Sequence, residues 1–82
     1  MIVPIGVECY AGWRAEQEPR VVHLETGSYR VRQVVDRWYE GGLEPTDPGA
    51  DYFKIELESS GIVLIKRDHS LNAWFLLTEA RR

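Results

Sequence analysis

The sequence has one cysteine, Cys9, and two histidines, His23 and His69, among its 82 residues. One cysteine cannot form an intramolecular disulfide or the thiolate cage of a structural zinc site. The histidines lie far from Cys9 and from each other, without the short ligand spacing of a metal site. We therefore expect no metal and no other cofactor, and the missing disulfides favour a reducing, cytoplasmic location.

Long apolar segments are missing as well. No uninterrupted apolar run approaches the roughly 20 residues that a membrane helix needs. The first residues, MIVPIGVECY, lack the basic start and the long apolar run of a signal peptide. A hydrophobic content of 44% is nevertheless too high for a disordered chain. We expect one soluble domain over residues 1–82, without membrane contact.

A recognisable catalytic constellation is also missing. The run Asp68, His69 and Ser70 contains an acid, a base and a nucleophile. Neighbours on a turn point apart, however, whereas catalytic triads assemble from distant positions. Asp68 and Ser70 are instead typical of turns in which the side chain bonds to nearby backbone amides. We predict that the protein is not an enzyme.

What the sequence does contain is a series of short strand patterns between turn-forming residues. Residues 3–9 and 53–57 alternate apolar and polar side chains, and residues 21–24, 62–65 and 73–78 are short, mainly apolar runs. Together with the stretch that begins at Tyr29, these segments predict an all-β fold. We expect about six antiparallel strands in a meander that closes into a small barrel or roll.

Two details of this fold follow from the sequence. Pro4 cannot donate a ladder hydrogen bond, so the first strand is expected to lie at a sheet edge or to begin near Pro4. A two- or four-residue connection between the strands at residues 53–57 and 62–65 would place Ile62 and Leu64 on the face of Phe53.

Residues 29–40, with the sequence YRVRQVVDRWYE, allow two interpretations. Four apolar residues recur with the spacing of one face of an amphipathic helix: Val31, Val34, Val35 and Trp38. A strand is favoured, because valine, tyrosine and tryptophan prefer pleated surfaces and no helix cap precedes the segment. A bulge near Gln33 and Val34 would account for the change of phase along that strand.

The same stretch holds the candidate binding surface. Its members are three arginines and two aromatic residues: Arg30, Arg32, Arg37, Trp38 and Tyr39. Single-stranded nucleic acid is bound by this combination, because arginines hold the backbone while rings stack on the bases. The alternative is a solvated strand face whose arginines pair with the carboxylates of residues 40–58, with Trp38 in the core. The net charge of −3 also argues against a protein that mainly grips phosphates.

Trp13 is a second candidate for a binding surface. It follows Gly12 in an expected loop, so it is less securely part of the core than the other tryptophans. An exposed Trp13 would mark a patch that binds a partner. The alternative is that Trp13 forms a lid over one open end of the barrel.

Three segments carry a resemblance to a known family. They are GSYRVRQVVDRW at residues 27–38, DYFKIE at residues 51–56 and NAWFL at residues 72–76. These segments resemble an uncharacterised family of small bacterial domains of unknown function, some of which occur beside, or fused to, proteins related to Y-family translesion DNA polymerases. The shared motifs are structural, so the resemblance implies a role near DNA repair by analogy and assigns no catalytic residue.

Three functions are compatible with these observations. The first is a non-enzymatic binding or adaptor module, accessory to DNA-repair machinery, whose arginine and aromatic surface binds a protein or single-stranded nucleic acid. The second is a protein-interaction or self-association module, such as a homodimer, that pairs through the Pro4 strand or through Trp13. The third is a small-ligand binder with a pocket at an open end of the barrel.

Overall fold

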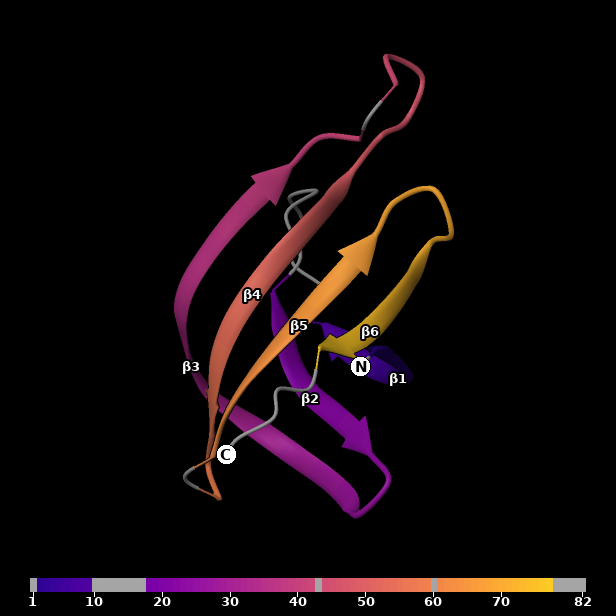
Figure 1. Cartoon of the computed structure of the whole chain (residues 1–82). Helices are drawn as coiled ribbons and strands as arrows, with labels where there is room; N and C mark the ends of the chain where they lie inside the picture. Colours follow the sequence, from indigo (N-terminus) through magenta and orange to yellow (C-terminus); the bar gives the residue numbers. More distant parts are fainter. Residues whose placement is uncertain (1, 10–17, 43, 60, 78–82) are drawn as a thin grey trace.

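The computed structural model is a closed barrel of six antiparallel strands, and it describes residues 2–9, 18–42, 44–59 and 61–77 (Figure 1). The strands are β1 (Ile2–Cys9), β2 (Pro19–Leu24), β3 (Gly27–Glu40), β4 (Ala50–Leu57), β5 (Ile62–Asp68) and β6 (Ala73–Leu77). Each pairs with its neighbour in sequence, and β6 pairs with β1. The prediction of an all-β meander that closes on itself is therefore confirmed. Trp13 lies outside the described residues.

The core is formed by the inward faces of β2, β4 and β5. Its fully buried cluster consists of five apolar residues: Val22, Phe53, Ile55, Leu57 and Ile65. Three of them alternate along β4, as the period-two pattern predicted. Each such side chain stabilises the fold by about 1.5–3 kcal/mol when it is removed from water. The centre of the barrel is therefore filled with side chains, and a binding site must lie at its ends or on its outer wall.

The register between β4 and β5 differs from our expectation. Phe53 lies opposite Ile65 and Ile55 lies opposite Val63, while the Leu57 amide donates to the Gly61 carbonyl at 2.8 Å. Val63 and Ile65 thus share the face of Phe53, and the prediction for Ile62 and Leu64 was wrong. A change of one residue in the turn moves every side chain to the other face of the strand. As a result, Ile62 is 57% exposed on the outer wall.

The first strand closes the barrel instead of lying at an edge. Its residues Ile2 to Ile5 pair with β6, and its residues Gly6 to Cys9 pair with β2. The expectation of an edge strand was therefore wrong. The other alternative, a strand that begins near Pro4, agrees with the start of β1 at Ile2. Pro4 is tolerated because its half of β1 pairs with β6 alone, so a missing amide donor there costs little.

The long strand β3 contains two bulges, and this explains its ambiguous sequence. Its register with β4 shifts between Val31 and Gln33 and again between Val34 and Asp36, so that Arg32 and Val35 are extra residues. Val31 and Val34 both pack against the core at a spacing of three, which imitates the period of a helix. The prediction of a strand is confirmed, and the expected bulge near Gln33 and Val34 is present as a pair of bulges.

Candidate functional site

The two bulges decide which side of the barrel wall each arginine occupies. One bulge would have turned Arg37 to the same side as Arg30, but a second bulge restores the original phase. Arg37 lies opposite the buried Phe53, and its guanidinium carbon is 4.9 Å from the centre of that ring. The structure therefore brings Arg30 and Arg32 close together but separates Arg37 from them.

Arg30 and Arg32 border two adjoining hollows on the wall formed by β1, β2 and β3. The larger hollow, about 280 Å³ in volume, is lined by Glu8, Cys9, Arg20, Val21, Arg30, Val31 and Glu58. The second, about 230 Å³, is lined by Glu18, Pro19, Arg20, Val31, Arg32, Gln33 and Val34. Arg20 borders both hollows, so we add it to Arg30 and Arg32, the two arginines that were expected from the sequence. We call Arg20, Arg30 and Arg32 the arginine wall.

The charges of Arg30 and Arg32 are not neutralised by direct ion pairs within residues 2–9, 18–42, 44–59 and 61–77. Two of the nearby carboxylates have other partners. Glu8 lies 2.8 Å from the Nε2 atom of His23, and Glu56 accepts a 2.7 Å hydrogen bond from the Gln33 amide. The expected alternative, in which carboxylates of residues 40–58 pair with these arginines, is thus not seen in this part of the chain.

An aromatic pair lies farther along β3 on the outer wall. Trp38 and Tyr52 face each other across the β3–β4 ladder, with ring centroids 5.4 Å apart and planes that differ by only 2°. Trp38 is 41% exposed, and the Lys66 ammonium lies 5.9 Å from the centre of the Tyr52 ring. Partial burial, followed by a hydrogen bond to Glu40, raises the pKa of the Tyr52 hydroxyl. Trp38 is thus an exposed platform that stacks on the half-buried Tyr52, so the alternative of a core position for Trp38 is wrong.

Tyr39 stabilises the loop between β3 and β4. Its hydroxyl donates a 2.6 Å hydrogen bond to the Pro48 carbonyl, and the Asp47 carboxylate accepts one of 2.9 Å from the Gly49 amide. Gly49 has a φ of +81°, and a Cβ atom there would collide with the Glu40 carbonyl. Tyr39 thus fixes this loop, and its ring is not part of the outer platform.

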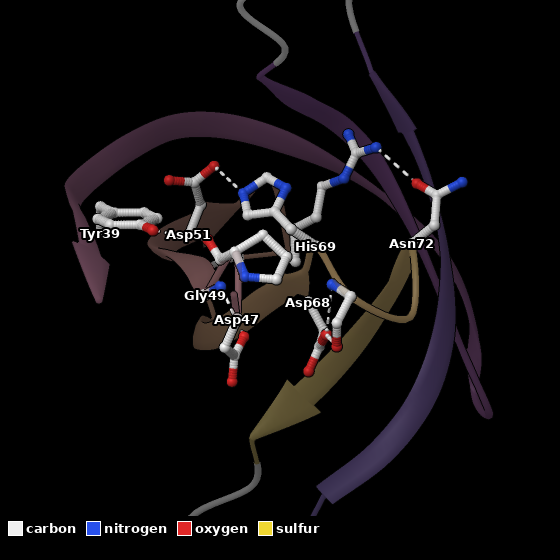
Figure 2. A network of polar contacts seen from close by, with 10 residues as sticks. Tyr39, Asp47, Gly49, Asp51, Asp68, His69 and Asn72 are labelled. Carbon is white, nitrogen blue, oxygen red and sulfur yellow. Dashed lines mark hydrogen bonds and ion pairs between the residues drawn. The ribbon is translucent and has the colours of Figure 1, made fainter. Parts of the chain in front are cut away.

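The loop and the β5–β6 turn lie at the same end of the barrel (Figure 1). The His69 amide donates to the Gly49 carbonyl at 3.0 Å, and its Nε2 atom lies 2.9 Å from Asp51 Oδ2 (Figure 2). This contact was not predicted from the sequence, where His69 was interpreted only together with Asp68 and Ser70. Their predicted turn chemistry is confirmed, since Asp68 Oδ1 accepts hydrogen bonds from the Ser70 hydroxyl at 2.8 Å and from the Leu71 amide at 3.0 Å.

Arg67 also belongs to this end of the barrel. It lies opposite Trp74 on the inward side of β5, with its guanidinium carbon 5.8 Å from the centre of the indole. Its Nη2 atom donates a 2.9 Å hydrogen bond to Asn72 Oδ1. Burial raises the pKa of the Cys9 thiol, and the charge of Arg67 partly opposes this shift. A thiol held protonated in this way fits the predicted packing role of Cys9.

The comparisons identify no relative. No family model, no curated protein and no solved structure matches the chain. The resemblance to the polymerase-associated bacterial domains therefore stays a prediction. Within the described segments, no three potential ligands of the His, Cys, Asp or Glu types cluster as a metal site would require. The same segments contain no helix of the length and hydropathy needed to cross a membrane.

Proposed function

We propose that the chain is a non-enzymatic binding module for single-stranded nucleic acid, which lies along the outer wall of β3. The observation that carries the proposal is the placement of two features on that wall. Arg30 and Arg32 lie near its beginning without an ion pair in the described part of the chain, and the exposed Trp38–Tyr52 pair lies near its end. The proposed surface comprises Arg20, Arg30, Arg32, Trp38 and Tyr52.

The two features suit the two parts of a nucleotide chain. Guanidinium groups bind phosphate oxygens through forked hydrogen bonds. The Trp38 ring, which is 41% exposed and stacked on Tyr52, can stack on a base, and each stacked base contributes about 1–3 kcal/mol. Along a strand, the distance from Arg30 to Trp38 is roughly 20–25 Å, which leaves room for several nucleotides between the two features.

The shape of β3 favours a single strand over a duplex. This strand bends strongly around the barrel (Figure 1), and its outer wall follows the bend. A ligand that touches both features must therefore curve, which is easy for a single strand and costly for a duplex, whose persistence length is about 150 base pairs. Arg37 and Tyr39 leave the proposed surface, because they face the other side of β3.

The expected affinity is moderate, and its salt dependence is that of a few phosphate contacts. Glu18 and Glu58 border the same hollows as the arginines, and the net charge of the chain is −3. Long-range attraction is therefore weak, and local contacts must supply most of the binding energy. A role accessory to DNA-repair machinery in the cytoplasm belongs to this proposal as well, supported only by the resemblance described above.

Titration of a labelled single-stranded oligonucleotide at 50 and 200 mM salt tests the proposal by fluorescence anisotropy. The double variant Arg30→Gln/Arg32→Gln should bind at least about tenfold more weakly and lose most of the salt dependence. Arg37→Gln removes the same type of charge from the inward side and serves as the matched control, with unchanged affinity. No binding by the unmodified chain at low salt would rule out the nucleic-acid function.

A second candidate is a protein-interaction module, favoured by apolar side chains on the outer wall of β1, β5 and β6. Ile2, Leu77 and Leu64 form a continuous cross-strand row there, beside the exposed Ile62. Exposed apolar rows of this kind occur at protein interfaces. Sedimentation at micromolar concentration tests self-association, and Ile62→Asp should abolish any dimer that forms through this row. If the chain stays monomeric at all concentrations, self-association is ruled out, and this candidate would require a different protein as the partner.

A further inference from the structure

The larger hollow on the barrel wall contains a guanidinium group and a carboxylate that do not pair with each other. Arg30 and Glu58 both border this hollow, which has a volume of about 280 Å³. Within the described part of the chain, neither the Arg30 guanidinium nor the Glu58 carboxylate has a hydrogen-bond or ion-pair partner. Forked donors and a two-oxygen acceptor are thus both available to a ligand in one hollow.

The backbone fixes the relative position of these two residues. The Glu58 amide donates a 2.9 Å hydrogen bond to the Arg30 carbonyl, which ties the end of β4 to β3. On the other side of β3, Arg30 lies opposite Val21 in the β2–β3 ladder. Val21 and Val31 supply apolar surface to the same hollow. The hollow therefore combines apolar surface with donors and acceptors at positions that the strand pairing holds constant.

A phosphate alone is a poor occupant for this hollow. Two carboxylates border it, and a carboxylate repels a phosphate and finds no donor on it. Glu8 is engaged by the Nε2 atom of His23 at 2.8 Å, whereas Glu58 has no such partner in the segments described. The occupant must therefore bring donors for Glu58 together with acceptors for Arg30. The volume is below the roughly 300–1,000 Å³ of a drug-sized ligand site and suits a single base.

Guanine meets this requirement better than the other bases. It has two neighbouring acceptors, N7 and O6, and beside them two neighbouring donors, N1–H and N2–H. Adenine and thymine alternate donors and acceptors along their edges, and cytosine has only one donor group. The arginine fork matches N7 and O6, and the two oxygens of a carboxylate match N1–H and N2–H. In a single strand these edges are unpaired and accessible.

We infer that this hollow binds a guanine base of the single strand, with the Arg30 fork on N7 and O6 and the Glu58 carboxylate on N1–H and N2–H. The inference rests on the proposed function and gives it a base preference. Arg32 borders the adjoining hollow and keeps its contact with phosphate. Where the sequence has no guanine, the Arg30 fork binds phosphate instead, so binding persists with lower affinity.

Anisotropy titration of labelled oligothymidylates that differ only at one central base tests the inference. The chain should bind the oligonucleotide with a central guanine about tenfold more tightly than those with thymine, adenine or cytosine, the discrimination of one bidentate base contact. Glu58→Gln leaves one acceptor oxygen, so the preference should fall below about threefold. This variant removes a negative charge at an exposed position, so the affinity for oligothymidylate and the stability should not fall.

Glu25→Gln is the matched control, because it removes the same charge at the exposed turn between β2 and β3, outside both hollows. It should keep the full guanine preference. Arg30→Lys keeps the charge and loses the fork, so it should lower the guanine preference and leave the affinity for oligothymidylate nearly unchanged.

Three results would overturn the inference and leave the proposed function intact. They are equal affinities for the four central bases, a preference for a base other than guanine, and a guanine preference that survives Glu58→Gln. If no oligonucleotide binds at low salt, the proposed function and the inference both fail.

Discussion

Arg37 lies directly opposite Phe53 in the β3–β4 ladder, and its guanidinium carbon is 4.9 Å from the ring centre. Two bulges precede this pair on β3, and each shifts the phase of the strand by one residue. Their combined effect returns Arg37 to the inward side while Arg30 faces outward. The same strand thus places one arginine on the outer wall and another on the inward side.

The bulges can be tested through two adjacent valines. Val34 packs against the core, whereas Val35 is the extra residue of the second bulge and is 47% exposed. Val34→Ala should lower the free energy of unfolding by about 1–2 kcal/mol, because it removes buried apolar area. Val35→Ala should change it by less than about 0.5 kcal/mol. Urea denaturation measures both values, and the opposite order would show that β3 runs without the bulges.

Much of the fold could be predicted from the sequence, because the alternation in β4 and the turn residues around it are local signals. The register of β5 could not, since a turn of one residue more or less is compatible with the same glycine and serines. The face of β3 on which Arg37 lies could not be predicted for a related reason. It depends on whether β3 has one bulge or two, and neither bulge has a distinctive residue.

The candidate site was predicted in part. Arg30, Arg32 and Trp38 were selected because charged and aromatic residues in one strand are conspicuous, and they remain in the proposed surface. Tyr52 was missed as the partner of Trp38, although its outward phase beside the inward Phe53 was readable from the alternation of β4. The Asp51–His69 contact joins β4 to the turn after β5, and it could not be found without the register of the β4–β5 pair.

Gly49 should be intolerant of any side chain. Its φ of +81° disfavours residues with a Cβ atom by about 1–2 kcal/mol, and a Cβ atom would also collide with the Glu40 carbonyl. We expect Gly49→Ala to lower the free energy of unfolding by more than about 2 kcal/mol. Gly61→Ala is the matched control, because open space surrounds that position, and its effect should stay within about 0.5 kcal/mol. Equal effects in thermal or urea unfolding would contradict this account of the loop.

The turn between β5 and β6 should contribute stability that depends on pH. The hydrogen bond from the Ser70 hydroxyl, followed by that from the Leu71 amide, lowers the pKa of the Asp68 carboxyl. A lowered pKa means that the contribution is fully present above the ordinary value of about 4 and is lost as the pH falls below it.

The stability difference between the unmodified chain and Asp68→Ala should therefore be about 1–2 kcal/mol at pH 7 and should shrink toward pH 2. Urea denaturation at several pH values measures this difference. Glu25→Ala, at an exposed position between β2 and β3, should show little difference at either pH. If Asp68→Ala lowers the free energy of unfolding by the same amount at pH 7 and at pH 2, the ionised carboxylate of Asp68 does not stabilise the turn.

The aromatic platform gives the most direct test of nucleic-acid binding. Trp38→Ala should weaken single-stranded oligonucleotide binding by about 1–3 kcal/mol, the usual contribution of one stacked base. Tyr39→Phe changes the next residue of β3, removes the hydrogen bond to Pro48 and should cost about 1 kcal/mol of stability without changing affinity. Anisotropy titrations and urea denaturation of both variants separate binding from folding. If Tyr39→Phe weakens binding as much as Trp38→Ala does, the ligand must lie on the inward side of β3 and not on the outer wall.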